Sequence, residues 1–196
     1  DQMLDSPTNN FCTWNPLMDM WSTHSEGNLK IVTGSGSDRW KRNATSSFLL
    51  PESGKWYWEV RVLVVSEICI GITIGYGGFD DQHPLKSCYY HSGGASQGYQ
   101  IEGSSVSTDP ASYTDDDIIG IAYNADDDEI TWYKNNASQG TETGLTATRK
   151  PVIAFVVQGS SSGTCSFVGN FGQDSSFAGE ATAQGNQDGN GIGDFY

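Results

Sequence analysis

The sequence lacks the two features that would suggest a membrane or nucleic-acid protein, a long apolar run and an excess of basic residues. No apolar stretch approaches the ~20 residues that a membrane-spanning helix needs. Ten lysines and arginines stand against 24 aspartates and glutamates in 196 residues, which gives a formal net charge of −14. Such a chain repels a phosphate backbone and anionic lipid headgroups. We therefore expect no nucleic-acid partner and no membrane insertion.

Metal-binding cysteine patterns and common catalytic motifs are also missing. The four cysteines, Cys12, Cys69, Cys88 and Cys165, are far apart, so no Cys-x-x-Cys or Cys/His cluster indicates zinc. Their spacing is compatible with one disulfide but does not indicate which two cysteines would form it. Neither a Gly-x-Ser-x-Gly, a His-Glu-x-x-His nor a P-loop motif occurs. We expect a protein that is not an enzyme.

The start of the chain carries no secretion signal, since it has neither a basic region nor an apolar one. It also lacks an initiator Met. We interpret the chain as a piece of a longer or processed polypeptide.

Alternating apolar residues and frequent turn signals predict an all-β fold. Helix formers are scarce, whereas Gly, Val, Ile, Thr and aromatic residues are frequent. On one predicted strand, Trp56, Trp58, Val60 and Val62 share a face, and we expect both tryptophans in the core. The clearest runs cover residues 28–34, 39–50, 55–65, 68–75, 98–103, 118–124, 129–134, 151–157 and 164–172. About ten such strands predict an antiparallel two-sheet β-sandwich.

Four consecutive acids, Asp126–Glu129, stand between two predicted strands and raise the question of a catalytic or metal site. A retaining glycosidase needs two carboxyl groups ~5 Å apart across a cleft, and calcium needs several converging oxygens. The connection has hairpin length, where Asn and Asp favour the turn backbone. We interpret the acids as a solvated hairpin tip and rank a lectin-fold glycan hydrolase last among the functions.

Five short motifs resemble, in order and spacing, the SPRY domain family. They are a Gly-x-x-Tyr-x-Glu strand, a Gly-Ile pair, an Asp-x-Ile-Gly strand that leads into a hairpin, a Tyr-Lys-Asn exit and a final Asn-Phe-Gly. The matching positions outside the Gly-Ile pair are Gly54, Tyr57, Glu59, Asp117, Ile119, Gly120, Tyr133, Lys134, Asn135, Asn170, Phe171 and Gly172.

The resemblance implies a bent sandwich of the concanavalin A-like, lectin-like jelly-roll type. It also implies a non-catalytic interaction module that binds its ligand through loops at one rim. On this basis residues 1–44 are a lead-in packed on the sandwich, 45–173 are the SPRY-like domain, and 174–196 are a Gly/Asn/Asp-rich extension.

The two ends of the chain resemble the flanks of SPRY-like domains in bacteriophage virion and tail-fibre proteins. This implies an extracellular module on a virion surface, a homo-oligomer within a larger assembly, that binds a host-surface glycan or protein. The alternative is a structural decoration or assembly domain of a virion or filament, whose aromatic rim packs against neighbouring virion subunits.

The long irregular stretch 75–98 holds the candidate ligand-binding residues. Aromatic rings beside polar groups suit sugar or protein recognition, because rings supply contact area at low entropic cost. The candidate set is Tyr76, Phe79, Asp80, Asp81, His83, Tyr89, Tyr90 and His91. The alternative is that Tyr89 and Tyr90 belong to a strand that sends one ring into the core.

The extension holds the best candidate metal site, and calcium is the one cofactor that the sequence suggests. Its spacing follows the first nine positions of an EF-hand loop, with oxygens at positions 1, 3 and 5, Gly at 6, a carbonyl at 7 and an acid at 9. The candidate ligands are Asn186, Asp188, Asn190, Ile192 and Asp194. The acid expected at position 12 would fall beyond Tyr196, and a metal-free Gly/Asn/Asp loop is the alternative.

Overall fold

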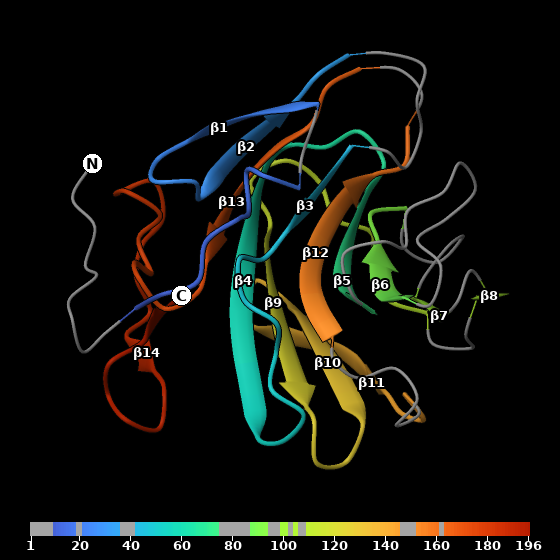
Figure 1. The fold of residues 1–196 in the computed structure, drawn as a ribbon, viewed down its shortest axis with the longest axis vertical. Coiled ribbons are helices and arrows are strands. Elements are labelled where there is room, and N and C mark those ends of the chain that lie inside the picture. Colours follow the sequence, from blue (N-terminus) through green and yellow to red (C-terminus); the bar gives the residue numbers. More distant parts are fainter. Residues whose placement is uncertain are drawn as a thin grey trace.

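The fold is a sandwich of two antiparallel sheets, and the described part of the chain contains no helix. The computed structural model describes residues 10–18, 21–35, 42–74, 87–93, 99–101, 104–105, 109–145, 152–160 and 163–196. Figure 1 shows the two sheets face to face, with the core between them. The predicted all-β sandwich is confirmed. No helix of the described residues is long and apolar enough to cross a membrane.

The first sheet has seven strands and the second has six. The order of the first is β1 (Ser22–Ser25), β2 (Lys30–Thr33), β13 (Ser166–Asn170), β4 (Lys55–Val64), β9 (Ile118–Asn124), β10 (Glu129–Lys134) and β11 (Ala137–Glu142). The order of the second is β3 (Asn43–Thr45), β12 (Val152–Gln158), β5 (Ile68–Ile74), β6 (Ser87–His91), β7 (Tyr99–Ile101) and β8 (Ser104–Ser105). The lead-in thus contributes strands to both sheets.

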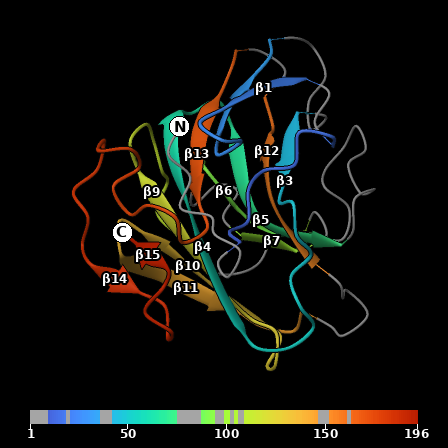
Figure 2. The ribbon, with the colours of Figure 1, turned by 60° about the vertical axis from the view of Figure 1, so that its left-hand side comes forward.

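The C-terminal extension forms a third layer outside the seven-stranded sheet. It ends in a hairpin of β14 (Asn186–Gln187) and β15 (Asp194–Phe195). Figures 1 and 2 both show this hairpin on the side of the seven-stranded sheet that faces away from β12 and β5. The outer face of that sheet is therefore partly covered by residues far away in the sequence.

The core between the sheets follows the predicted alternation along β4. Trp58, Val60 and Val62 are buried in it, while the intervening side chains point to the outer face. The indole N–H of Trp132 donates to the Ile70 carbonyl at 3.3 Å and so joins the two sheets. Trp56 departs from the prediction: it is 37% exposed, because it stands at the start of the strand and its indole N–H donates to a nearby turn.

The six-stranded sheet carries a second apolar cluster on its outer face. Tyr89 and Phe155 meet there, with ring centroids 6.3 Å apart in an edge-to-face arrangement. Both residues pair with Gly71, which stands between them on β5. An added Cβ at Gly71 would lie 2.0 Å from the Cys88 carbonyl oxygen, so the close strand contact requires glycine.

The acidic segment is the turn of the β9–β10 hairpin, as predicted, and its side chains also stabilise that turn. The Asn124 amide oxygen accepts hydrogen bonds from the backbone N–H groups of Asp126 and Asp127. Asp126 in turn accepts a hydrogen bond at 2.9 Å from the backbone N–H of Gly54. The Asn124 amide and the Asp126 carboxylate thus fix two adjacent turns.

Gly71→Ala tests the close strand contact. The added methyl group collides with backbone rather than with a flexible side chain, so we expect a loss of about 3 kcal/mol in the free energy of unfolding. Gly189→Ala is the matched control, because nothing lies within 4 Å of its added Cβ. Urea unfolding measures both, and equal midpoints for the two variants would contradict the account.

Candidate functional site

A buried carboxylate, Glu59, lies at the centre of the outer face of the seven-stranded sheet. Its side chain is 0% exposed and belongs to β4. It accepts hydrogen bonds from the Tyr57 hydroxyl at 3.0 Å and the Asn170 amide at 2.9 Å. The backbone N–H of Tyr196 lies 3.1 Å from both carboxylate oxygens. Glu59 therefore joins two strands of the sheet to the end of the extension.

Burial controls the protonation of this group. Desolvation raises the pKa of Glu59 to about 6, against an ordinary value of 4.5, although the hydrogen bonds from Tyr196, Asn170 and Tyr57 act in the opposite direction. The donors are neutral, so they satisfy the oxygens without compensating the charge.

Asn170 connects Glu59 to the turn from which the extension starts. Its amide N–H groups donate to Glu59 and, at 2.9 Å, to the carbonyl of Asp194. Its amide oxygen accepts from the backbone N–H groups of Gly172 and Gln173, both at 2.9 Å. This one side chain thus sets both the direction in which the extension leaves β13 and the position to which it returns.

The other motif residues also meet in space. Lys134 forms an ion pair with Asp117 at 3.0 Å, and the Asn135 amide donates to the same carboxylate at 2.7 Å. Gly120 lies under the Tyr57 ring, where an added Cβ would be 2.3 Å from the hydroxyl oxygen. Asp117, Lys134, Asn135 and Gly120 therefore form contacts that hold the outer face and its hairpin in place.

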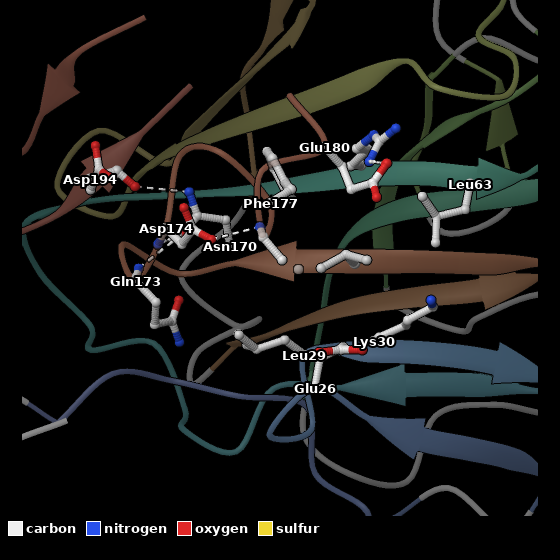
Figure 3. A pocket seen from close by; sticks show the side chains of 14 residues that line it. Glu26, Leu29, Lys30, Leu63, Asn170, Gln173, Asp174, Phe177, Glu180 and Asp194 are labelled. Atoms are coloured by element: carbon white, nitrogen blue, oxygen red, sulfur yellow. Dashed lines mark hydrogen bonds and ion pairs between the residues drawn. The ribbon is translucent and has the colours of Figure 1, made fainter. Parts of the chain in front are cut away.

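The docked extension encloses a groove of about 710 Å³ on one side of Glu59, which we call the sheet groove. Side chains from β2, β13 and β4 form its floor, and residues 173–180 form the opposite wall. Figure 3 shows Phe177 and Glu180 of the extension facing Leu29 and Lys30 across it. This volume lies within the range that is usual for ligand-binding pockets.

The sheet groove combines apolar surface with an excess of negative charge. Arg61 lies at its base and contacts Asp116 at 2.8 Å and Glu180 at 3.8 Å. Lys30 is the other basic residue of the lining. The acidic residues of the lining are Glu26, Asp174, Glu180 and Asp194. A ligand with an apolar group beside a positive charge would complement this lining.

Hydrogen bonds to Asp174 stabilise the wall of the groove. Burial raises the pKa of Asp174, but hydrogen bonds from Ser176 and Ala178 outweigh that effect and keep the pKa below its ordinary value. The bonded atoms are the Ser176 hydroxyl, at 2.6 Å, and the Ala178 backbone N–H, at 2.7 Å. The ionised carboxylate therefore stabilises the turn that carries Phe177.

A second, smaller hollow of about 450 Å³ lies on the other side of the extension, and we call it the tyrosine hollow. Its lining residues are Tyr57, Ala122, Tyr133, Asn136, Gln184 and Asn186. It combines the sheet, the β10–β11 turn and the extension.

Three of the predicted ligand residues are buried in the six-stranded sheet. Tyr89, Tyr90 and His91 all belong to β6, and none is more than 2% exposed. Tyr90 packs in the core between the sheets and Tyr89 in the cluster on the outer face. The strand alternative thus applies to both tyrosines, with both rings buried rather than one. The remaining predicted residues, Tyr76, Phe79, Asp80, Asp81 and His83, lie outside the described residues.

The predicted calcium ligands fold into the turn between β14 and β15. One oxygen of Asp188 accepts hydrogen bonds from the backbone N–H groups of Asn190 and Ile192, which lower the pKa of this carboxyl group. Asn186 donates to the Tyr196 carbonyl, and Asp194 accepts from the Ser175 backbone N–H. No group of three or more His, Cys, Asp or Glu side chains in the described segments is placed to hold a metal ion. Calcium binding stays a prediction of the sequence.

Sequence reasoning did not find the sheet groove or the tyrosine hollow. Each combines residues of the sheet with residues of the extension. Some of these residues, such as Tyr57 and Gln184, are more than a hundred positions apart in the sequence. The outward alternation of Tyr57, Glu59 and Arg61 on β4 was the one signal available. It indicated a polar outer face but not what covers it.

Comparison with known proteins supports the fold and the motif assignment. The family model of the SPRY domain matches residues 55–174, more than half of the chain. No curated protein sequence matches.

Solved structures agree in fold at low sequence identity. The SPRY domain of human HERC1 is 15% identical, with a TM-score of 0.61, over 80% of this chain and 96% of that one. A human SPRY domain is 16% identical, with a TM-score of 0.60, over 78% and 96% of the two chains. The stonustoxin structure is 15% identical, with a TM-score of 0.54, over 81% of this chain but only 28% of its own.

Glu59→Gln tests the buried carboxylate through the pH dependence of stability. Because the folded-state pKa is raised, protonated Glu59 favours the fold below about pH 4.5, and this contribution is lost as the pH rises through about 6. The unfolding free energy of the wild type relative to the variant should therefore fall by about 1–2 kcal/mol between these limits. Urea unfolding at a series of pH values measures the difference.

Glu52→Gln serves as the control, since it removes the same charge from an exposed turn position. A difference between wild type and Glu59→Gln that stays constant with pH would contradict the assignment.

Proposed function

Because the chain belongs to the SPRY domain family, whose members are generally non-catalytic protein-interaction modules, we propose that it binds a protein segment in the sheet groove. The observation that carries this proposal is the groove itself, which the docked extension completes on an otherwise open sheet face. The wall and the floor are both held by hydrogen bonds, so little conformational entropy is lost when a ligand binds.

The lining of the groove suits a polypeptide with an apolar side chain next to Lys or Arg. Leu29, Leu63, Val168 and Phe177 supply apolar contact, and the acidic residues outnumber the basic ones. Burial of an apolar side chain supplies affinity, while the negative charge of the lining selects a partly basic segment. The net charge of −14 also attracts basic partners to the chain as a whole.

We further propose that this module stands on a virion surface and recognises a host-surface molecule. The proposal rests on the resemblance of both chain ends to the flanks of phage virion and tail-fibre domains, and on the acidic composition. Tyr76, Phe79, Asp80, Asp81 and His83, which the sequence suggests as ligand residues, are a second proposed contact with the host protein or glycan.

The assembly alternative is favoured by one observation, large apolar side chains that are exposed on two paired segments. Leu17 is 88% exposed, and Phe48 and Leu49 are also exposed. The two segments lie together, because the Ser47 backbone N–H donates to the Thr13 carbonyl at 2.7 Å. Exposed apolar side chains of this size are found at contacts between subunits, and a homo-oligomer would bury them.

Selection from a random-peptide library tests binding in the groove. We expect enriched peptides to combine an apolar residue with Lys or Arg, and Leu63→Ser to weaken their binding at least about tenfold, since it removes apolar contact at the groove floor. Val64→Ser is the matched control, because Val64 is the exposed neighbour on the same strand and does not line the groove.

Peptides that bind Leu63→Ser as tightly as the wild type would contradict the groove as the site. A chain that enriches no peptide but associates with itself through Leu17 and Phe48 would favour the assembly alternative.

A further inference from the structure

We propose that the tyrosine hollow is a second binding site and that its ligand is a neutral carbohydrate. The inference goes beyond protein binding in the sheet groove. The two depressions lie on opposite sides of the extension and share no lining residue.

The first argument is the absence of charge from the lining. None of the six residues that line the hollow is acidic or basic, although the chain as a whole has a formal net charge of −14. The nearest carboxylate on the same strand, Glu59, is buried and accepts its hydrogen bonds from Tyr57, Asn170 and Tyr196. The hollow thus offers no ion pair to a charged ligand, and a neutral one fits it best.

The second argument is a pair of tyrosine rings that are already held in place. The rings of Tyr57 and Tyr133 have centroids 6.5 Å apart and planes inclined by 70°. Tyr57 is fixed further by an edge-to-face contact with Phe195 at 5.0 Å and by its hydrogen bond to Glu59. The electron-rich face of an aromatic ring attracts polarised C–H groups, which line one face of a sugar ring.

The third argument is a set of side-chain amides around these rings. Gln184 and Asn186 each donate one amide N–H internally, to the carbonyls of Thr182 and Tyr196. These bonds orient the side chains and leave an amide oxygen and a second N–H on each. Asn136 adds a third amide from the exposed turn after β10. Groups that both donate and accept match sugar hydroxyls, which also do both.

Other ligand classes fit the hollow less well. An apolar peptide side chain would find Ala122 as the only aliphatic partner, since the rest of the lining is aromatic or amide. An acidic or basic ligand would lose its hydration shell without gaining an opposite charge. A cavity of about 450 Å³ falls within the usual range of small-molecule sites, which suits a short oligosaccharide.

An oligosaccharide array with neutral, sialylated and sulfated members tests this inference on the full chain. Saturation-transfer NMR then measures affinity for the best neutral members. We expect binding to a subset of the neutral members with dissociation constants below about 1 mM. Asn136→Gly should weaken it at least about threefold, because it removes one amide. The change is compatible with the backbone, since Asn136 has a φ of 65° that glycine adopts freely. Tyr133→Ala should weaken binding at least about tenfold.

The groove variant Leu63→Ser is the reciprocal control and should bind the same oligosaccharides with unchanged affinity. Conversely, Asn136→Gly should leave peptide binding in the sheet groove unchanged, so the two proposals fail separately. Thermal melting shows whether Tyr133→Ala is still folded, and Asn136→Gly keeps the test valid if it is not. The inference is overturned if no neutral oligosaccharide binds at about 10 mM. It is equally overturned if charged members are preferred, or if both variants bind as the wild type does.

Discussion

The hydrogen bond between Glu59 and Asn170 is the contact on which the outer face of the protein depends. It links β4 to the end of β13 at 2.9 Å, and the two residues also pair in the sheet register. Asn170 turns the chain into the extension, and Glu59 binds the backbone N–H of Tyr196 where the extension returns. Both depressions use residues of this extension, so both exist only while it is docked.

The cost of burying the Glu59 carboxylate explains why the extension docks in one position. A buried carboxylate loses its hydration, and its charge is tolerated only if each oxygen finds donors. At Glu59 the donors come from the same strand, the neighbouring strand and the extension. If one of them is removed, at least one oxygen of the buried carboxylate loses a hydrogen bond. The site therefore favours a single docked position of the extension over alternatives that would leave Glu59 incompletely bonded.

The sequence predicted the parts of the fold that repeat a local pattern. The bounds of β9 and β10 agree with the predicted strands to the residue, because both are rich in β-branched and aromatic residues and flank an Asn/Asp turn. Strand β6 was predicted only as the alternative to an irregular stretch, since its five residues are all buried and show no alternation. Trp56 alternates with core residues yet is exposed, because alternation along a strand does not show where the opposite sheet ends.

The candidate sites could be predicted only in part, because they depend on contacts between distant segments. The resemblance to SPRY domains identified Tyr57, Glu59 and Asn170 as motif residues. It did not indicate what these residues do in the structure. They belong to a hydrogen-bond network that spans 137 positions between Glu59 and Tyr196. A local sequence pattern carries no information on where the chain returns to the sheet. The sheet groove and the tyrosine hollow both depend on that return.

Amide hydrogen exchange in the wild type and in Asn170→Ala measures the docking of the extension most directly. The account predicts that the amides of Gly172, Gln173 and Tyr196 exchange slowly in the wild type, because each donates to Asn170 or Glu59. In the variant they should exchange at least about tenfold faster, while the amides of β12 keep their protection. Unchanged protection of the extension in Asn170→Ala would contradict the account.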